Sequence, residues 1–424
     1  MSPQIIIVGA GPAGCTLAAL LALRGVPVLV FDDDKRPSLL VGESLIPAVV
    51  PLFRKLGIEE RVKDFCVHKP GASFFATTGE KLHFSFQNVA DHLPPYSYNT
   101  PRPEFDNLLR QRAEELGARF VKAHAKVTAD GDTLRLSDES RALAGLAPSD
   151  PQPLLIDASG RSRLFARTLQ LPAHRGPRND VAYFAHYENF RHDEVTPGTV
   201  IISVLTHGWS WRIPLKDRLS VGVVLSKDHA AAFGSTAEER LENIIRQEPL
   251  LRDHGASARR VTDVMTYTNY QLLSERGHGP GWILLGDAFG FVDPMLSPGL
   301  FMSMEGARLL DELVLQPHPL PGPAQNAALA QYSARVTRWH QSWSQLVEYF
   351  YNGQIFRAYE GGRKLCATYP ETHVMRKFDR YVNRVIASMA SGGRTCSRYS
   401  QTFLKILCRY LIRDVQPASY FSVR

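Results

Sequence analysis

The sequence predicts an α/β protein built on a Rossmann-type parallel sheet, and three consecutive segments carry this prediction. Residues 5–8 are a short, wholly apolar and β-branched run, which is typical of a parallel strand buried on both faces. Apolar residues then recur at helical spacing from Gly11 to Gly25, where the helix is expected to end. Residues 26–31 resemble a second strand, so the segment forms one βαβ unit.

Later segments of the chain extend this architecture. Residues 154–156 and 281–285 are further short apolar runs, so we expect them to join the buried sheet. Residues 200–224 contain alternating apolar and polar positions and predict a separate sheet. The proline-rich segment 316–323 is typical of a linker, and the chain beyond it has a helical, aromatic pattern.

The composition excludes several classes of protein. The chain has 424 residues, of which 44% are apolar and 21% charged, so it is too apolar to be disordered and long enough for two or three packed units. Its five cysteines form no CxxC pair and no His/Cys cluster, which argues against a disulfide scaffold and predicts no metal site. No basic leader precedes the first strand, and no apolar run approaches the roughly 20 residues of a membrane span. We therefore expect a cytoplasmic protein without a transmembrane segment.

Residues 9–14, GAGPAG, fit the dinucleotide fingerprint GxGxxG in its required context. A strand precedes the motif, a helix follows it, and Asp32 ends the next strand. Gly9 permits the tight turn, Gly11 lets a pyrophosphate approach the backbone, and Gly14 allows close packing of helix and strand. Ala13 lies in the same turn. Asp32 is expected to accept a hydrogen bond from a ribose, so the motif predicts a bound dinucleotide.

Three motifs in chain order resemble the flavoprotein monooxygenase superfamily and imply that the dinucleotide is FAD. The first is PRPEFDNLL, in which Arg102 matches the arginine that contacts the flavin. The second is the segment DASG at residues 157–160. The third is LGDA, in which Gly286 and Asp287 match the GD motif whose aspartate holds the ribityl chain. A strand-end carboxylate is a suitable fixed acceptor for a ribityl hydroxyl.

Two further motifs resemble the flavin-dependent halogenases. Residues 208–214, GWSWRIP, match the family signature GWxWxIP, in which Trp209, Trp211 and Pro214 are expected to separate the flavin from the organic substrate. Residues 291–299 match FxxPxxSxG, which implies a chloride or bromide site at a helix N-terminus. The residue before the final glycine is a proline without an N–H, so we expect Gly299 and Leu300 to bind the halide.

A third halogenase-like segment carries a candidate catalytic lysine. Residues 42–47, GESLIP, are followed by Lys69 in the tripeptide KPG, and Lys69 matches the essential lysine of the family. Ser44 in the first part is expected to contact the cofactor. The ammonium of a lysine can polarise hypohalous acid, and its neutral amine can form an N-haloamine, a form that desolvation favours. Tryptophan halogenases also use a glutamate near this lysine, and its counterpart cannot be placed in the sequence.

The resemblance implies an FADH₂-dependent halogenase acting in antibiotic or other secondary-metabolite biosynthesis. Reduced FAD would come from a separate flavin reductase, and O₂ and halide would yield hypohalous acid. The substrate would be an electron-rich aromatic such as a phenol or pyrrole, either free or on a carrier protein, halogenated by electrophilic substitution through Lys69. The alternatives are an aromatic hydroxylase that reduces its own FAD with NAD(P)H and a non-catalytic flavoprotein or redox-sensing module.

The motifs and composition together suggest three regions. Residues 1–165 and 270–315 are expected to form a discontinuous FAD-binding domain, residues 166–269 a substrate-side β-sheet, and residues 316–424 a helical, basic region. The formal net charge of the whole chain is +7.

The basic charge of the chain is concentrated at its C-terminal end. Residues 376–424 contain ten Lys/Arg against two Asp, so the excess positive charge lies there. Basic residues there, including Arg409 and Arg413, interleave with apolar ones in the pattern of an amphipathic helix. An acidic carrier protein is the partner we expect first. Alternatively, this helix binds an anionic membrane surface or only packs on the core of the protein. We expect no nucleic-acid partner.

Overall fold

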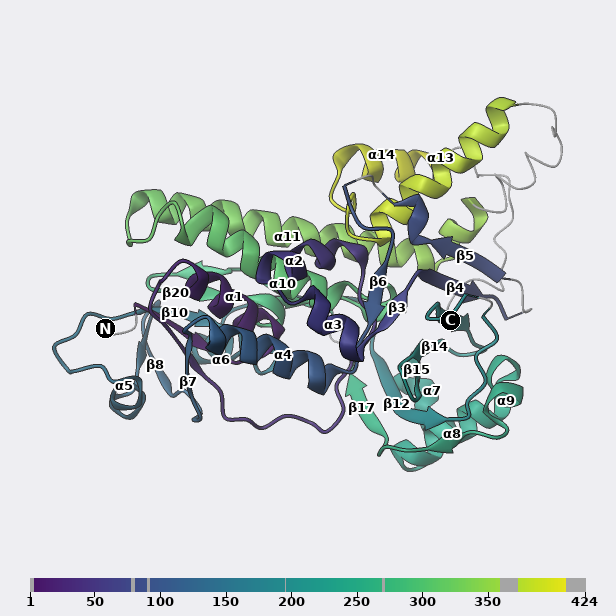
Figure 1. Cartoon of the computed structure of the whole chain (residues 1–424), viewed down its shortest axis with the longest axis horizontal. Helices are drawn as coiled ribbons and strands as arrows, with labels where there is room; N and C mark the ends of the chain where they lie inside the picture. The colour runs from purple at the N-terminus through teal and green to yellow at the C-terminus, as the bar shows by residue number, and fades with distance from the viewer. Residues whose placement is uncertain are drawn as a thin grey trace.

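The computed structural model describes residues 4–77, 81–89, 92–194, 196–268, 271–358 and 373–408. Two large sheets lie at the centre of the molecule, with helices packed around them (Figure 1). None of the helices in these ranges is long and apolar enough to cross a membrane. The α/β class expected from the sequence is confirmed.

The first sheet has six strands in the order β19-β20-β10-β1-β2-β7. Its strands are β1 (Ile5–Val8), β2 (Val28–Phe31), β7 (Arg119–Val121), β10 (Leu154–Asp157), β19 (His278–Gly279) and β20 (Trp282–Leu284). All neighbouring strands pair in parallel except β19, which is antiparallel to β20. Every residue of β1 and β2 is buried, as expected of parallel strands covered on both faces.

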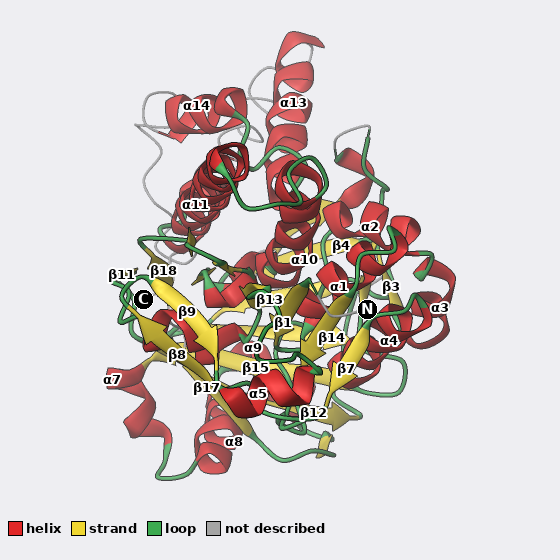
Figure 2. Ribbon diagram, turned by 90° about the vertical axis from the view of Figure 1, so that its left-hand side faces the viewer, coloured by secondary structure: helices red, strands yellow, loops and turns green. Residues whose placement is uncertain are grey.

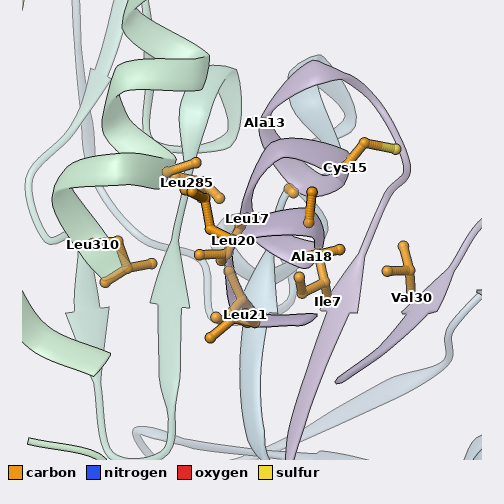
Figure 3. Close-up of a cluster of buried hydrophobic side chains, with 14 of the residues drawn as sticks. Ile7, Ala13, Cys15, Leu17, Ala18, Leu20, Leu21, Val30, Leu285 and Leu310 are labelled. Atoms are coloured by element: carbon orange, nitrogen blue, oxygen red, sulfur yellow. The ribbon is translucent and has the colours of Figure 1, made fainter. Parts of the chain in front are cut away.

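Helix α1 (Pro12–Leu23) packs between the six-stranded sheet and α10 (Pro298–Leu310). Figure 3 shows Leu17 and Leu21 of α1 in one cluster with Leu285 and Leu310. Burial of a leucine side chain of this kind contributes about 1.5–3 kcal/mol. The core therefore holds the start of α1 against the strand ends, where the glycine-rich turn lies.

The second sheet is larger and contains the sequence 200–224, which confirms the separate sheet expected there. Its path runs β16-β12-β15-β14-β13-β4-β5, and β17 pairs with β12. The strands are β4 (Gly71–Phe75), β5 (Lys81–Ser85), β12 (Asp180–Glu188), β13 (Val200–Val204), β14 (Trp209–Pro214), β15 (Leu219–Ser226), β16 (Arg259–Arg260) and β17 (Met265–Thr268). Two of these, β4 and β5, come from the part of the chain before residue 165. The second sheet thus draws on more of the chain than segment 166–269.

Smaller elements connect and cover the two sheets. Three further small sheets consist of β3 (Val67–Lys69) with β6 (Ser97–Asn99), β8 (Val127–Asp130) with β9 (Thr133–Leu136), and β11 (Ala173–Arg175) with β18 (Leu272–Ser274) and β21 (Gly290–Phe291). The other α-helices before α10 are α2 (Val50–Leu56), α3 (Glu59–Phe65), α4 (Arg102–Glu115), α5 (Asp138–Ala144), α6 (Leu164–Thr168), α7 (Lys227–Ala230), α8 (Ala237–Gln247) and α9 (Pro249–Gly255).

The C-terminal part of the chain is helical where the structure describes it. It contains α11 (Pro323–Tyr351), α13 (His373–Ala390) and α14 (Arg398–Ile406). These helices gather at one side of the molecule, with α13 and α14 beyond α11 from the six-stranded sheet (Figure 2). Arg409 and Arg413 lie outside the described residues, so the amphipathic pattern expected there is not tested.

We predict that Gly14→Ala destabilises the protein by about 3 kcal/mol. A Cβ on Gly14 would lie 2.0 Å from the carbonyl oxygen of Gly9. Helix propensity favours alanine by about 1 kcal/mol, but overpacking against a fixed backbone costs more. Gly11→Ala is the matched control, because its Cβ would meet no atom within 4 Å. Chemical denaturation of both variants checks this, and equal stabilities would contradict the packing role of Gly14.

Candidate active site

A cavity of about 700 Å³ lies between the glycine-rich turn and the second sheet. This volume is within the range of about 300–1,000 Å³ that is usual for ligand and cofactor sites. The predicted site residues on its wall are Gly9, Gly11, Asp32, Ser44, Arg102, Trp209, Trp211, Asp287, Gly299 and Leu300. The structure therefore brings together most of the motifs that are scattered along the sequence.

The glycine-rich turn forms one end of the cavity. Gly9 has a φ of +104°, and a Cβ there would lie 2.4 Å from the carbonyl oxygen of Ala158. Gly11 precedes α1 and borders open space, so a ligand can approach its backbone closely. Ala13 and Gly14 do not line the cavity and instead pack behind the turn.

Asp32 ends β2 and reaches the same end of the cavity. Its carboxylate accepts a hydrogen bond of 2.8 Å from Arg36, which also donates to the carbonyl oxygen of Ala10 at 2.8 Å. Nη1 of Arg110 lies 3.6 Å from the same carboxylate oxygen. The arginines were not singled out from the sequence, although Arg36 stands only four residues after Asp32 and lines the cavity.

Arg102 and Asp287 lie on the wall between the two sheets. Arg102 donates to the carbonyl oxygen of Val41 and to both carboxylate oxygens of Asp106, at 3.0 and 3.1 Å. Asp287 follows the turn at Gly286, whose φ is +60°. Burial raises the pKa of Asp287 to about 6, although nearby positive charge on Arg102 opposes the rise. A half-buried carboxylate on a cavity wall is a suitable partner for ligand hydroxyl groups.

The two indoles of the WxW motif face the cavity from β14. The ring centroids of Trp209 and Trp211 are 5.8 Å apart, and both side chains are buried. Gly222 on β15 makes room for them, since a Cβ there would lie 2.1 Å from the ring of Trp211. Pro214 does not join them. It lines a second cavity, of about 410 Å³, and not the one that Trp209 and Trp211 line.

Tyr351 at the end of α11 connects the WxW strand to the loop before α10. The indole N–H of Trp209 donates to the Tyr351 hydroxyl at 2.8 Å, and that hydroxyl donates to Asp293 at 3.0 Å. The guanidinium of Arg178 lies 3.9 Å from the centre of the tyrosine ring. Burial and the charge of Asp293 raise the pKa of Tyr351 well above its usual value, so the hydroxyl stays neutral.

The loop that leads into α10 supplies free backbone donors to the cavity. Ser297 adopts a left-handed conformation with a φ of +58°, and α10 begins at Pro298. The amides of Gly299 and Leu300 fall in the first turn, where N–H groups have no partner within the helix. This geometry agrees with the anion site predicted there, because helix N-termini attract anions.

Lys69 lies behind the cavity wall and not on it. It ends β3, is only 3% exposed, and donates to the Ser44 hydroxyl at 2.7 Å and the Leu45 carbonyl oxygen at 2.8 Å. The ring of Phe86 lies 5.2 Å from its Nζ atom. Burial lowers the pKa of Lys69 to about 7, so a large neutral fraction exists at neutral pH. Ser44 is thus the residue that touches both the cavity and the lysine.

Glu43 and His186 form a buried polar contact that no motif in the sequence indicates. Within the described part of the chain, no carboxylate makes an ion pair with Lys69. The neighbouring Glu43 turns instead to His186, with 2.7 Å between Oε1 and Nε2. Arg218 donates to Nδ1 of His186 at 2.9 Å, so the imidazole proton lies on Nε2 and points at Glu43. The contact fixes the segment before Ser44 to the second sheet.

Comparisons with known proteins agree with this arrangement. The model of the tryptophan halogenase family matches residues 88–355, and that of the FAD binding domain matches residues 2–140. The chain therefore belongs to the tryptophan halogenase family. It is a flavin-dependent halogenase, an oxidoreductase whose cofactors are FAD and a halide, chloride or bromide.

Several curated relatives resemble most of the chain. It is 28% identical to the tryptophan 2-halogenase of Chondromyces crocatus, over 82% of this chain and 68% of that protein. It is 25% identical to the 1H-pyrrole-2-carbonyl-[peptidyl-carrier protein] chlorinase of Pseudomonas fluorescens, over 83% and 84% of the two chains. It is 27% identical to the corresponding brominase of Pseudoalteromonas luteoviolacea, over 85% and 88%.

Solved structures share the fold. A flavin-dependent brominase superposes with a TM-score of 0.74 at 21% identity, covering 95% of this chain and 97% of the other. The chondrochloren halogenase superposes with a TM-score of 0.72 at 23% identity, over 91% and 97% of the two chains.

The residues around the cavity fit FAD. The open space at Gly11 can accept a pyrophosphate, and Asp32 lies where an adenosine ribose would follow it. Asp287 is a half-buried carboxylate on the cavity wall without an ion pair among the described residues, which suits a ribityl hydroxyl. No group of three or more metal-ligating side chains occurs in the part of the chain that the structure describes.

We predict that Tyr351→Phe lowers the free energy of unfolding by about 1–3 kcal/mol, because it removes the acceptor of the buried Trp209 indole N–H and one hydrogen bond to Asp293. Tyr349→Phe on the same helix is the control, since its hydroxyl only accepts a long 3.4 Å bond from Gln345, and a change below about 0.5 kcal/mol is expected. Urea denaturation measures both. Similar losses in the two variants would refute the role of the Tyr351 hydroxyl.

Proposed function

We propose that the protein halogenates an electron-rich aromatic ring by electrophilic substitution, with the halogen delivered by Lys69. The observation that supports this most directly is the position of that lysine. The side chain of Lys69 is buried, and its pKa of about 7 leaves a large fraction of the amine neutral near neutral pH. Ser44 separates the lysine from the cavity that fits FAD. In this proposal a small oxidant passes from the cavity to the lysine, and the arene reacts at the lysine and not at the flavin.

The binding roles follow from the cavity wall. Gly9, Gly11 and the start of α1 would hold the pyrophosphate, and Asp32 the ribose. Arg102 and Asp287 would hold the flavin end. When bound and reduced, FAD supplies the two electrons that convert O₂ and a halide ion into hypohalous acid and water. In this proposal the reduced cofactor comes from a separate flavin reductase.

The halide would bind at the start of α10. Gly299 and Leu300 line the cavity in the first turn of the helix, and Pro298 has no N–H to donate, so the donors are limited to these later positions. Trp209 and Trp211 also line the cavity, where their bulky rings would keep an organic substrate from the flavin while a hypohalous acid molecule passes.

Lys69 would carry the halogen as an N-haloamine. A neutral amine has two N–H donors, and the Ser44 hydroxyl and Leu45 carbonyl accept both of them, leaving its lone pair for the halogen. The nitrogen bonds to the halogen, the halogen–oxygen bond breaks, and the released hydroxide takes an amine proton to form water. The arene then takes the halogen, and its ring proton returns to the nitrogen.

A pyrrole or phenol ring is the substrate class we propose, presented free or on a carrier protein. Two curated relatives that align over more than four fifths of both chains are named for pyrrole-2-carbonyl groups on a peptidyl carrier protein. Electron-rich rings of this kind react readily with electrophilic halogen.

The expected domain boundaries and the expected cytoplasmic location remain predictions.

We predict that Lys69→Ala abolishes halogenation but leaves FAD binding and folding intact, because Lys69 does not line the cavity that fits FAD. The measurement is product formation by mass spectrometry with a flavin reductase, bromide or chloride and candidate arenes. Lys55→Ala is the control, since that lysine is exposed and pairs with Glu312. Halogenation by Lys69→Ala at the wild-type rate would rule out the lysine mechanism.

We also predict that the purified protein does not oxidise NADH or NADPH alone and turns over only when a reductase supplies reduced FAD. The sequence offers one GxGxxG-type site, and the cavity it forms is the one assigned to FAD. The measurement is loss of nicotinamide absorbance with and without reductase and halide. Rapid, halide-independent oxidation coupled to hydroxylation of an arene would favour the aromatic hydroxylase instead.

A further inference from the structure

We infer that α13 and α14 carry a docking face for an acidic carrier protein that presents the aromatic substrate. The docking face consists of Tyr381, Tyr399, Phe403 and Ile406 with the basic residues Lys377, Arg394, Arg398 and Lys405 around them. This inference rests on the proposed halogenase function and adds the partner and its place of contact.

The apolar centre of the docking face is exposed although its members are large. Tyr399 is 58%, Ile406 46% and Tyr381 37% exposed. The ring of Phe403 packs edge-on against Tyr381 at 5.4 Å and stacks on Tyr399 at 6.3 Å, and the two tyrosine hydroxyls are 2.5 Å apart. Exposed and mutually packed aromatic rings are typical of the anchor residues of protein interfaces.

The residues around this centre are mostly basic. Residues 377–405 contain six Lys/Arg and one acidic residue, Asp379. Among the residues that the structure describes, no carboxylate makes an ion pair with Arg394, Arg398 or Lys405, whereas Arg308 on α10 pairs with both Glu305 and Glu312. Arg394 also acts on the ring cluster, since its charge opposes the rise in the pKa of Tyr381 that the Tyr399 hydroxyl causes.

The docking face is connected to both segments that enclose Lys69. The amide of Ala48 donates to the carbonyl oxygen of Ser391 at 3.1 Å in the turn after α13. Gly392 in that turn lies so close to Ala48 that a Cβ on it would be 2.6 Å away. Ala48 stands three residues after Leu45, whose carbonyl oxygen accepts from Lys69.

On its other side, α13 contacts the short 3₁₀-helix at Phe86–Asn88, and the Phe86 ring lies over Lys69. A partner seated on α13 and α14 therefore sits beside the two segments that enclose Lys69. A carrier protein is the partner that needs this proximity, because its substrate remains tethered during the reaction. The basic residues of the docking face complement an acidic surface, so they would speed association with an acidic carrier protein at low salt.

The test compares wild-type protein with the double variant Arg394→Glu/Arg398→Glu. The probe is an acidic acyl carrier protein loaded with a pyrrole-2-carbonyl group. Its Kd is measured by fluorescence anisotropy, and kcat/KM is measured for the loaded carrier and for a free pyrrole or phenol. We expect Kd to rise and kcat/KM for the loaded carrier to fall at least tenfold at low salt, with a much smaller difference at high salt and no change with the free arene.

A matched control is Arg119→Glu/Arg246→Glu, which makes the same change in net charge at exposed positions on β7 and α8. Tyr399→Ser provides a second probe that keeps the charge and removes an exposed ring, and it should also weaken carrier binding selectively. Equal effects of the docking-face and control variants, or equal loss with free and tethered arenes, would overturn the docking face.

Other outcomes are also decisive. Binding of the wild-type protein to vesicles of anionic phospholipid with no binding of the carrier would replace the carrier by a membrane and overturn the inference. Failure of the wild-type protein to halogenate any arene with reductase and halide is a different result, because it contradicts the proposed function itself. Halogenation of free arenes without measurable carrier binding contradicts only the docking face.

Discussion

The hydrogen bond between Lys69 and Ser44 is the contact on which the organisation of the site depends. Ser44 lines the cavity that fits FAD, and Lys69 lies behind it, so this single 2.7 Å bond connects the cavity wall to the buried amine. Removal of an ammonium group from water is unfavourable, and the resulting low pKa makes the lysine available as a neutral amine. Both the place of Lys69 behind the cavity wall and its low pKa require that the fold hold Ser44 in position.

Long-range polar contacts supply that support. Glu43, next to Ser44, is fixed by His186 on β12, and His186 is in turn oriented by Arg218. On the other wall, Tyr351 joins Trp209 on β14 to Asp293 in the loop before α10. Buried polar groups of this kind are costly when unpaired, so these networks favour one arrangement of the strands and loops around the cavity.

The C-terminal helices contribute on both of their faces. Their inner side packs with the WxW strand in one apolar cluster, which includes Trp343, Phe350 and Phe356. These aromatic side chains are core residues and do not line the cavity. The outer side of α13 and α14 stays exposed and basic, and the turn between them touches the segment that leads away from Ser44. One helical unit thus connects the interior of the site to the protein surface.

Much of the fold and of the cofactor cavity could be predicted from the sequence because the relevant signals are local. The glycine-rich turn, its two strands and Asp32 lie within thirty residues, where spacing alone relates backbone conformation to ligand contact. Only the tertiary structure decided which distant residues meet: Glu43 and His186 are 143 positions apart, and Trp209 and Tyr351 are 142 apart. It likewise turned Pro214 away from the cavity and put Lys69 behind Ser44. Such contacts follow from strand pairing and side-chain packing between remote segments, and no local pattern encodes them.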